Sequence, residues 1–217
     1  MVDALLPGFG MTETFTGKFV NAYDLRPEDI CIEDIAHHLA MECRFAGACK
    51  RRYSVGEHSL LVQRFLAAED QARPTLQLAG LLHDAFETYG KDIPTPQKSS
   101  IYRLAEDKGM KLIAKVLDFE YPSLAVQRAD RILCWLEADV LLPSRGRGWL
   151  GYEEHGRETI EAYRSSAHME RIIQGPGGEG DIEEFFLSAF ADLKVAIGGA
   201  APLGAIGRRG VANTSQA

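Results

Sequence analysis

The sequence predicts an all-α domain with one short β-hairpin near its N-terminus. Apolar residues recur at helical spacing along most of the chain, as in Ile182, Phe186 and Phe190. Signals for helix starts precede such stretches, for example Ser54 and Glu57, which form a capping box. A chain of 217 residues that is 46% hydrophobic can bury a core of its own, so we expect a single domain.

Strand-like alternation is confined to the first part of the chain. Three aromatic residues alternate loosely around Gly17 within residues 14–23, which predicts the hairpin. Residues 1–13 have no periodicity, and we expect a flexible N-terminus there. Residues 198–217 hold small residues without a large periodic apolar set, which predicts a disordered tail. The folded domain is therefore expected to span 14–197.

Seven stretches of helical spacing fill this domain. The first begins at Pro27, and the acids in its first turn interact favourably with the helix macrodipole. Another follows Pro122, because proline suits the first turn of a helix. A run of glycine and proline from Gly175 to Gly178 separates the last two. The expected helices are 27–41, 54–68, 74–89, 100–118, 122–143, 152–173 and 181–197.

The helix expected at 74–89 carries the strongest chemical signal of the chain. His83 and Asp84 are adjacent within an apolar run, where a buried charge costs several kcal/mol unless it is compensated. On a continuous helix, Glu87 would share a face with His83, since it lies four residues later. Asp92 follows a break in the pattern and returns an acid towards the same helix end. A metal ion would compensate these charges.

Two further helices aim an ionisable group at the core. His58 lies on the apolar stripe of its helix, and Asp130 shares a face with Val126 and Leu133. Each of these residues taken singly could be a core or capping residue. Three helices that each aim such a group inward favour one metal site. Nitrogen and oxygen ligands suit Mn²⁺, Co²⁺, Fe²⁺, Ni²⁺ or Zn²⁺ and suit Mg²⁺ less well, and the choice among them stays open.

The composition argues against several classes of protein. A net charge of −7 and a pI near 5.4 argue against binding of a nucleic-acid polymer, which requires a basic surface. Free nucleotides remain possible ligands if the metal and local cations such as Arg44 and Lys98 supply positive charge. The four cysteines have no C-x-x-C spacing, and neither a signal peptide nor a membrane span is apparent. We therefore expect a cytoplasmic protein with reduced thiols.

These residues resemble the signature of a known superfamily. His58, the pair His83 and Asp84, and Asp130 match the H…HD…D motif of the HD-domain metal-dependent phosphohydrolases. The resemblance runs from about residue 14 to residue 139. The sequence segments around this motif resemble those of the branch that holds bacterial 5′-deoxynucleotidases and viral dATP triphosphohydrolases. These segments are 33–37, 43–47, 53–59 and 90–98.

The resemblance implies an HD-domain helical bundle in which His58, His83, Asp84 and Asp130 bind one metal ion. It assigns proton transfer to Glu87 and Asp92. By the same resemblance, four further residues contact the substrate, Arg44 and Lys98 at the phosphate and Phe45 and Pro96 at the base. We also expect a homo-oligomer.

Three functions compete at this point. The leading one is hydrolysis of 2′-deoxynucleotide phosphates, with either monophosphates or triphosphates as substrates and dAMP or dATP as the sharpest expectation. The second is hydrolysis of another phosphoester, such as a cyclic or signalling nucleotide. The third is a nucleotide-sensing module without activity. The presence of both Glu87 and Asp92 argues against the third, because an inactive site does not require two acids for proton transfer.

Overall fold

The computed structural model describes residues 11–69, 73–175 and 182–198. All but the first residue of the tail expected at 198–217 lies outside these residues, as does most of the N-terminus that we expected to be flexible. The hairpin begins earlier than expected, because its first strand already covers Met11 to Glu13. No helix of the described part combines the length and the apolar character needed to cross a bilayer.

The described residues form nine α-helices and one two-stranded hairpin, which confirms the prediction of an all-α fold with a short hairpin. Short 3₁₀ turns and one π-helical turn, η4 (Tyr152–Gly156), lie between the helices. The strands and helices are β1 (Met11–Glu13), β2 (Phe19–Asn21), α1 (Ile32–Met41), α2 (Val55–Glu69), α3 (Pro74–Leu81), α4 (Glu87–Gly90), α5 (Ser100–Leu117), α6 (Leu124–Leu141), α7 (Arg157–Tyr163), α8 (Ala167–Gln174) and α9 (Ile182–Ala196). The 3₁₀ turns are η1 (Pro27–Asp29), η2 (Arg44–Gly47) and η3 (Thr95–Gln97).

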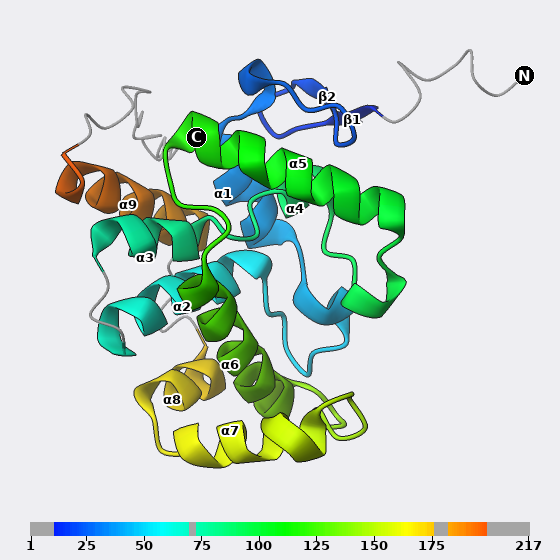
Figure 1. Ribbon diagram of the computed structural model, residues 1–217, viewed down its shortest axis with the longest axis vertical. Helices are drawn as coiled ribbons and strands as arrows, with labels where there is room; N and C mark the ends of the chain where they lie inside the picture. Colours follow the sequence, from blue (N-terminus) through cyan, green and yellow to red (C-terminus); the bar gives the residue numbers. More distant parts are fainter. Residues whose placement is uncertain (1–10, 70–72, 176–181, 199–217) are drawn as a thin grey trace, which may run out of the picture.

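The helices are arranged around α2, which runs through the middle of the molecule (Figure 1). The helix α5 lies beside the hairpin at one end, and α6 leads from that end towards α7 and α8 at the other. The hairpin is fixed to α1 by Asp34, whose buried carboxylate accepts hydrogen bonds from the backbone N–H (2.7 Å) and the hydroxyl (2.8 Å) of Thr16.

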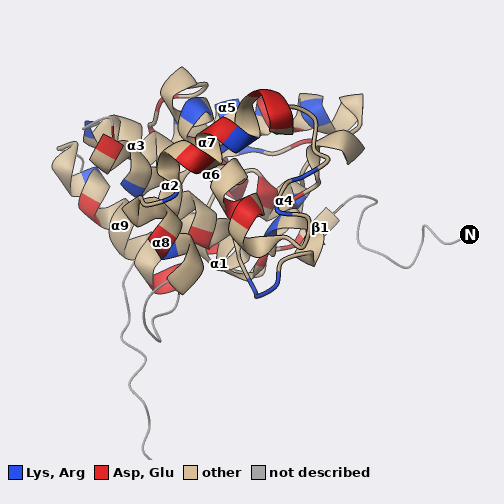
Figure 2. Cartoon of the chain, turned by 90° about the horizontal axis from the view of Figure 1, so that it is seen from below, with Lys and Arg blue, Asp and Glu red and all other residues tan. Residues whose placement is uncertain are grey.

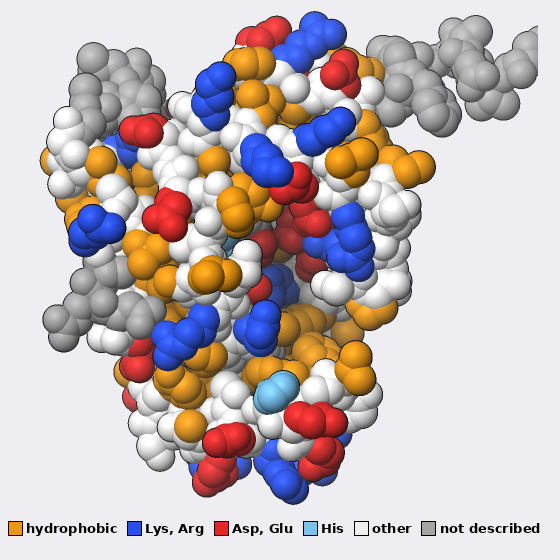
Figure 3. Space-filling view, viewed as in Figure 1, with side chains coloured by type: hydrophobic (Ala, Val, Ile, Leu, Met, Phe, Trp, Pro, Cys, Tyr) orange, Lys and Arg blue, Asp and Glu red, His pale blue; other side chains and the backbone are white. Residues whose placement is uncertain are grey.

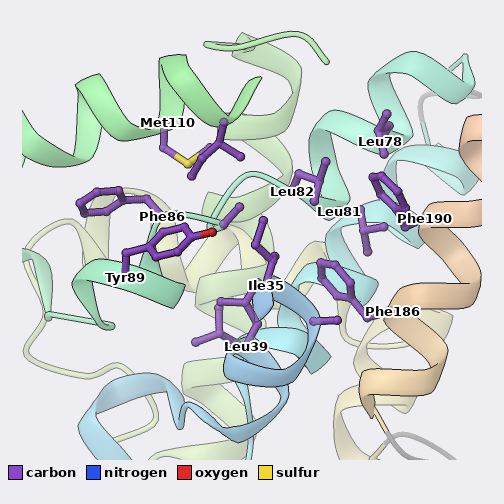
Figure 4. Packing of buried hydrophobic residues seen from close by; sticks show 14 of the residues in the cluster. Ile35, Leu39, Leu78, Leu81, Leu82, Phe86, Tyr89, Met110, Phe186 and Phe190 are labelled. Carbon is purple, nitrogen blue, oxygen red and sulfur yellow. The ribbon is translucent and has the colours of Figure 1, made fainter. Parts of the chain in front are cut away.

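The core has two apolar clusters. One joins α1, α5 and α9 to the segment that follows α3, and Figure 4 shows Ile35, Phe86 and Phe186 packed within it. The other joins α2 to α6 and α8 through residues such as Phe65 and Leu133. Because α2 contributes residues to both clusters, this helix is packed on two sides.

The prediction of one continuous helix over 74–89 is wrong. The helix α3 ends at Leu81, and residues 82–86 form a series of turns before the short helix α4. Backbone hydrogen bonds from residue i to residue i−3 stabilise these turns, for example the bond from the Glu87 N–H to the Asp84 carbonyl at 2.9 Å. The Gly80 carbonyl accepts instead from Nδ1 of His83 at 2.8 Å. His83 and Asp84 therefore lie in a break between helices.

Three other stretches differ from the prediction. The stretch 27–41 is divided into η1 and α1, because the backbone of Ile30 and Cys31 is extended. The stretch 152–173 is divided into η4, α7 and α8, because the Ser166 hydroxyl caps α8 by accepting from the Met169 N–H at 3.2 Å. The helix α6 starts at Leu124, just after the proline that we expected in its first turn.

The packing of Phe86 gives a first prediction. A methyl group on Gly109 of α5 would collide with the buried Phe86 ring, so Gly109→Ala overpacks the core. We expect the free energy of unfolding in urea to fall by about 1–3 kcal/mol, although alanine is the better helix former. The exposed neighbour Lys108→Ala serves as the control, and its change should stay within about 0.5 kcal/mol. An unchanged urea midpoint for Gly109→Ala would contradict the packing described here.

Candidate metal centre

Four potential ligand atoms converge from three parts of the fold. His58 comes from α2, His83 and Asp84 from the break after α3, and Asp130 from α6. Nε2 of His83 lies 3.2 Å from Nε2 of His58 and 3.1 Å from Oδ2 of Asp84. Two ligands at right angles around an ion, with bonds of about 2.1 Å, are about 3.0 Å apart. The compact triad of His58, His83 and Asp84 can therefore hold a metal ion.

Asp130 approaches this triad from the side of the two imidazoles. Its Oδ1 lies 3.1 Å from Nε2 of His58 and 3.9 Å from Nε2 of His83. In Figure 2, acidic segments of the chain are visible near the labels α4 and α6. The structure therefore brings together all four residues that the sequence nominated as metal ligands.

The outer nitrogens of both imidazoles are occupied. Nδ1 of His58 donates to Oε1 of Glu137 at 2.6 Å, and Nδ1 of His83 donates to the Gly80 carbonyl. In neutral rings, both Nε2 atoms then direct lone pairs at each other and at the carboxylates of Asp84 and Asp130. Four acceptors facing one another repel unless a cation lies among them. The donor set thus fits a divalent ion of the transition series.

The pKa values of His58 and Asp84 reflect the close approach of these charged groups. Burial and the charge of Arg44 lower the pKa of His58, but Glu137 and Asp130 outweigh them and raise it to about 9. Burial alone would raise the pKa of Asp84, yet the neighbouring imidazole of His83 and other cations hold it well below its usual range. Without an ion, His58 therefore carries a proton with which a metal must compete.

Glu137 is the site residue that the sequence reasoning missed. It is fully buried on α6, and its carboxylate accepts from Nε of Arg44 at 3.1 Å and from the hydroxyl of Tyr53 at 2.8 Å, besides His58. Burial would raise the pKa of Glu137, but Arg44 and His58 hold it low. A signal was present, since Glu137 lies seven residues after Asp130 and so on the same helix face, two turns along.

A pocket of about 190 Å³ opens beside these ligands. His83, Asp84 and Asp130 line one side of it, and α5 with residues 120–127 forms the rest. Figure 3 shows acidic side chains gathered within a hollow of this face. The pocket thus offers access to the candidate metal centre from solvent.

Glu87 lines the same pocket with a buried carboxyl group. Its Oε2 has no hydrogen-bond partner among the described residues. Burial, and then the charges of Asp84 and Asp92, raise the pKa of Glu87 well above its usual range. Burial also raises the pKa of Asp92. The two acids nominated for proton transfer are therefore close enough to influence each other, and Glu87 faces the pocket with a raised pKa.

None of the four residues nominated as substrate contacts is among the residues that line this pocket. The buried guanidinium of Arg44 is paired with Glu137 and, at 3.4 Å, with Asp84. Nζ of Lys98 lies 2.6 Å from Oε1 of Glu106. Pro96 is exposed, and Phe45 is half-buried with its ring centroid 5.9 Å from that of Trp149. Their contact with a substrate stays a prediction.

Comparison with known proteins gives two relatives and no family model that matches the chain. The uncharacterized protein RCAP_rcc00048 of Rhodobacter capsulatus is 38% identical over 138 residues, which cover 57% of this chain and 69% of that protein. The uncharacterized protein YfdR of Escherichia coli is 37% identical over 98 residues, 44% of this chain. The latter match spans about half of the E. coli protein, 52% of its length.

Removal of one ligand tests the candidate centre. Asp84 contributes an oxygen of the compact triad, so Asp84→Ala should abolish stoichiometric binding of Mn²⁺, Co²⁺ or Zn²⁺ in metal analysis of the dialysed protein. Asp118→Ala, an acid at the exposed end of α5, serves as the control and should keep its metal. Full metal content in Asp84→Ala would rule out this ligand set.

The role of Glu137 gives a separate prediction. Glu137→Gln removes the charge that orients His58, so metal affinity in calorimetric titration should fall about 10–100-fold. Asp139→Asn is the matched control, because Asp139 lies on the same helix and pairs with Arg145 away from the centre. Equal affinities for these two variants would show that Glu137 has no influence on the ligands.

Proposed function

We propose that this chain, which belongs to the family of RCAP_rcc00048, is a metal-dependent phosphohydrolase that acts on 2′-deoxynucleotides. One observation carries the proposal. Four acceptors from His58, His83, Asp84 and Asp130 converge beside a pocket into which Glu87 presents a buried carboxyl group, whose Oε2 has no hydrogen-bond partner among the described residues. Hydrolysis of a phosphoester requires both an electrophilic centre and a proton donor, and this arrangement offers both.

A divalent ion of Mn, Co, Fe, Ni or Zn, held by these four residues, would supply a Lewis acid for a phosphoryl oxygen and a site for the attacking water. The chain itself supplies the proton chemistry. The raised pKa of Glu87 suits a group that donates a proton to the departing oxygen. The pKa of Asp92 is raised as well, so Asp92 is the second candidate for proton transfer. Arg44 keeps Asp84 and Glu137 ionised without adding an exposed cation.

Shape and charge favour a nucleotide with a single phosphate at the metal. The pocket has an apolar side formed by Phe86, Met110 and Val126, which suits a flat base. The cations nominated for additional phosphates, Arg44 and Lys98, already have carboxylate partners. We therefore place dAMP ahead of dATP as the first substrate to test.

The experiment is a substrate panel. Protein loaded in turn with Mn²⁺, Co²⁺, Ni²⁺, Zn²⁺ or Mg²⁺ is incubated with the four deoxynucleoside monophosphates, dATP and AMP, and free phosphate and tripolyphosphate are measured. We expect release of phosphate from dAMP with at least one transition metal and slower release from AMP. If no metal supports release from any deoxynucleotide, the proposed function is wrong.

Glu87 provides the mechanistic test. Glu87→Ala should lower kcat for dAMP by a factor of about 100 or more while metal content is retained, because Glu87 transfers a proton and is not a ligand. The exposed acid Glu158 on α7 offers a control in Glu158→Ala, which should keep full activity. Loss of metal from Glu87→Ala would make Glu87 a ligand and remove its role in proton transfer.

A further inference from the structure

A small cavity lies between α2, α8 and the first turn of α9. Its lining shares no residue with the pocket beside the metal ligands. Arg64 of α2 and Arg171 of α8 both line this cavity, together with the rings of Tyr53 and Phe185. Its volume is about 20 Å³, so it admits one small group and excludes a whole nucleotide.

The two arginines of the cavity have no carboxylate partner. Within the described part of the chain, neither guanidinium has a hydrogen bond or an ion pair. One acid, Glu57, is among the described residues of the lining. Its Oε1 accepts from Nη1 of Arg51 at 3.0 Å, and its Oε2 accepts from the Ser54 N–H at 3.1 Å. The charge of Glu57 is thus compensated by Arg51, and the cavity keeps an excess of two positive charges.

These two charges face each other at close range. Both arginine side chains are half-buried. Burial, and then the charge of Arg171, lower the pKa of Arg64. Two cations that have lost part of their water and line one cavity repel each other unless an anion lies between them. A phosphate dianion matches their combined charge, and its oxygens suit the planar donors of guanidinium groups better than a single carboxylate does.

We propose that Arg64 and Arg171 bind one phosphate group in this cavity. The phosphate accepts charge-assisted hydrogen bonds from both guanidinium groups and thereby joins α2 to α8. The ligand is inorganic phosphate or the phosphate of a small monoester whose remaining atoms lie outside the cavity. This binding site is separate from the candidate metal centre and does not depend on the proposed function.

The test compares phosphate binding to the wild-type protein and to the double variant Arg64→Gln/Arg171→Gln. Each protein is titrated with inorganic phosphate in a calorimeter, at a pH where phosphate is a dianion. Affinity in the double variant should fall about tenfold or more, and each single variant should lose part of it. Phosphate that binds at the metal centre contributes to both proteins, so the difference between them reports the arginine site.

Two further anions define the ligand. Acetate at the same ionic strength should bind much more weakly than phosphate, because it carries one negative charge. Glycerol 3-phosphate distinguishes the two sources of the phosphate group. Affinity equal to that of inorganic phosphate identifies a monoester as an acceptable ligand, whereas weak binding identifies free phosphate as the ligand.

Thermal unfolding separates the loss of the site from a loss of the fold. In buffer without phosphate, the double variant should unfold at the same temperature as the wild type or at a higher one, because a repulsion has been removed. Phosphate should raise the unfolding temperature of the wild type and change that of the double variant less, since a ligand stabilises the state that binds it.

Arg147→Gln serves as the matched control, because Arg147 is an exposed arginine that does not line the cavity. This variant should bind phosphate as the wild type does. Wild-type affinity for phosphate in the double variant would overturn the proposal, and so would equal affinities of the wild type for phosphate and acetate. Absence of deoxynucleotide hydrolysis would contradict the proposed function alone, since the titration requires no turnover.

Discussion

Glu137 lies fully buried on α6, and its two carboxylate oxygens accept hydrogen bonds from Arg44, Tyr53 and His58. An unpaired carboxylate at that depth would cost several kcal/mol, so these three donors are a condition for the fold as well as for the site. The network fixes His58 in one tautomer and brings Arg44 against Asp84. The geometry of the metal ligands depends on this one carboxylate.

The sequence was informative wherever one side of a helix faces the core. His58 and Asp130 lie on amphipathic helices, so periodicity alone identified them as inward-facing ionisable groups. It failed over 82–86, because Leu82, Ala85 and Phe86 are all buried and the run is apolar on every side. A buried helix and a buried turn have the same pattern in such a run.

Other features depended on contacts between distant parts of the chain. The sequence contains Glu137 as one acid within an apolar helix, and its hydrogen bonds to Arg44, Tyr53 and His58, which lie 79 to 93 residues away, distinguish it from a solvated residue. Lys98 appeared available for phosphate, whereas its ammonium is paired with Glu106 of α5.

The break between α3 and α4 links the binding of an ion to the backbone conformation of residues 82–86. Successive side chains on a helix diverge by about 100°, so His83 and Asp84 bring their ligand atoms to 3.1 Å only because the helix ends before them. An ion that binds both side chains therefore stabilises the turns at 82–86 against a regular helix. Affinity for the ion and the local conformational equilibrium of this segment are therefore thermodynamically linked, so residues far from the ligands can change the affinity.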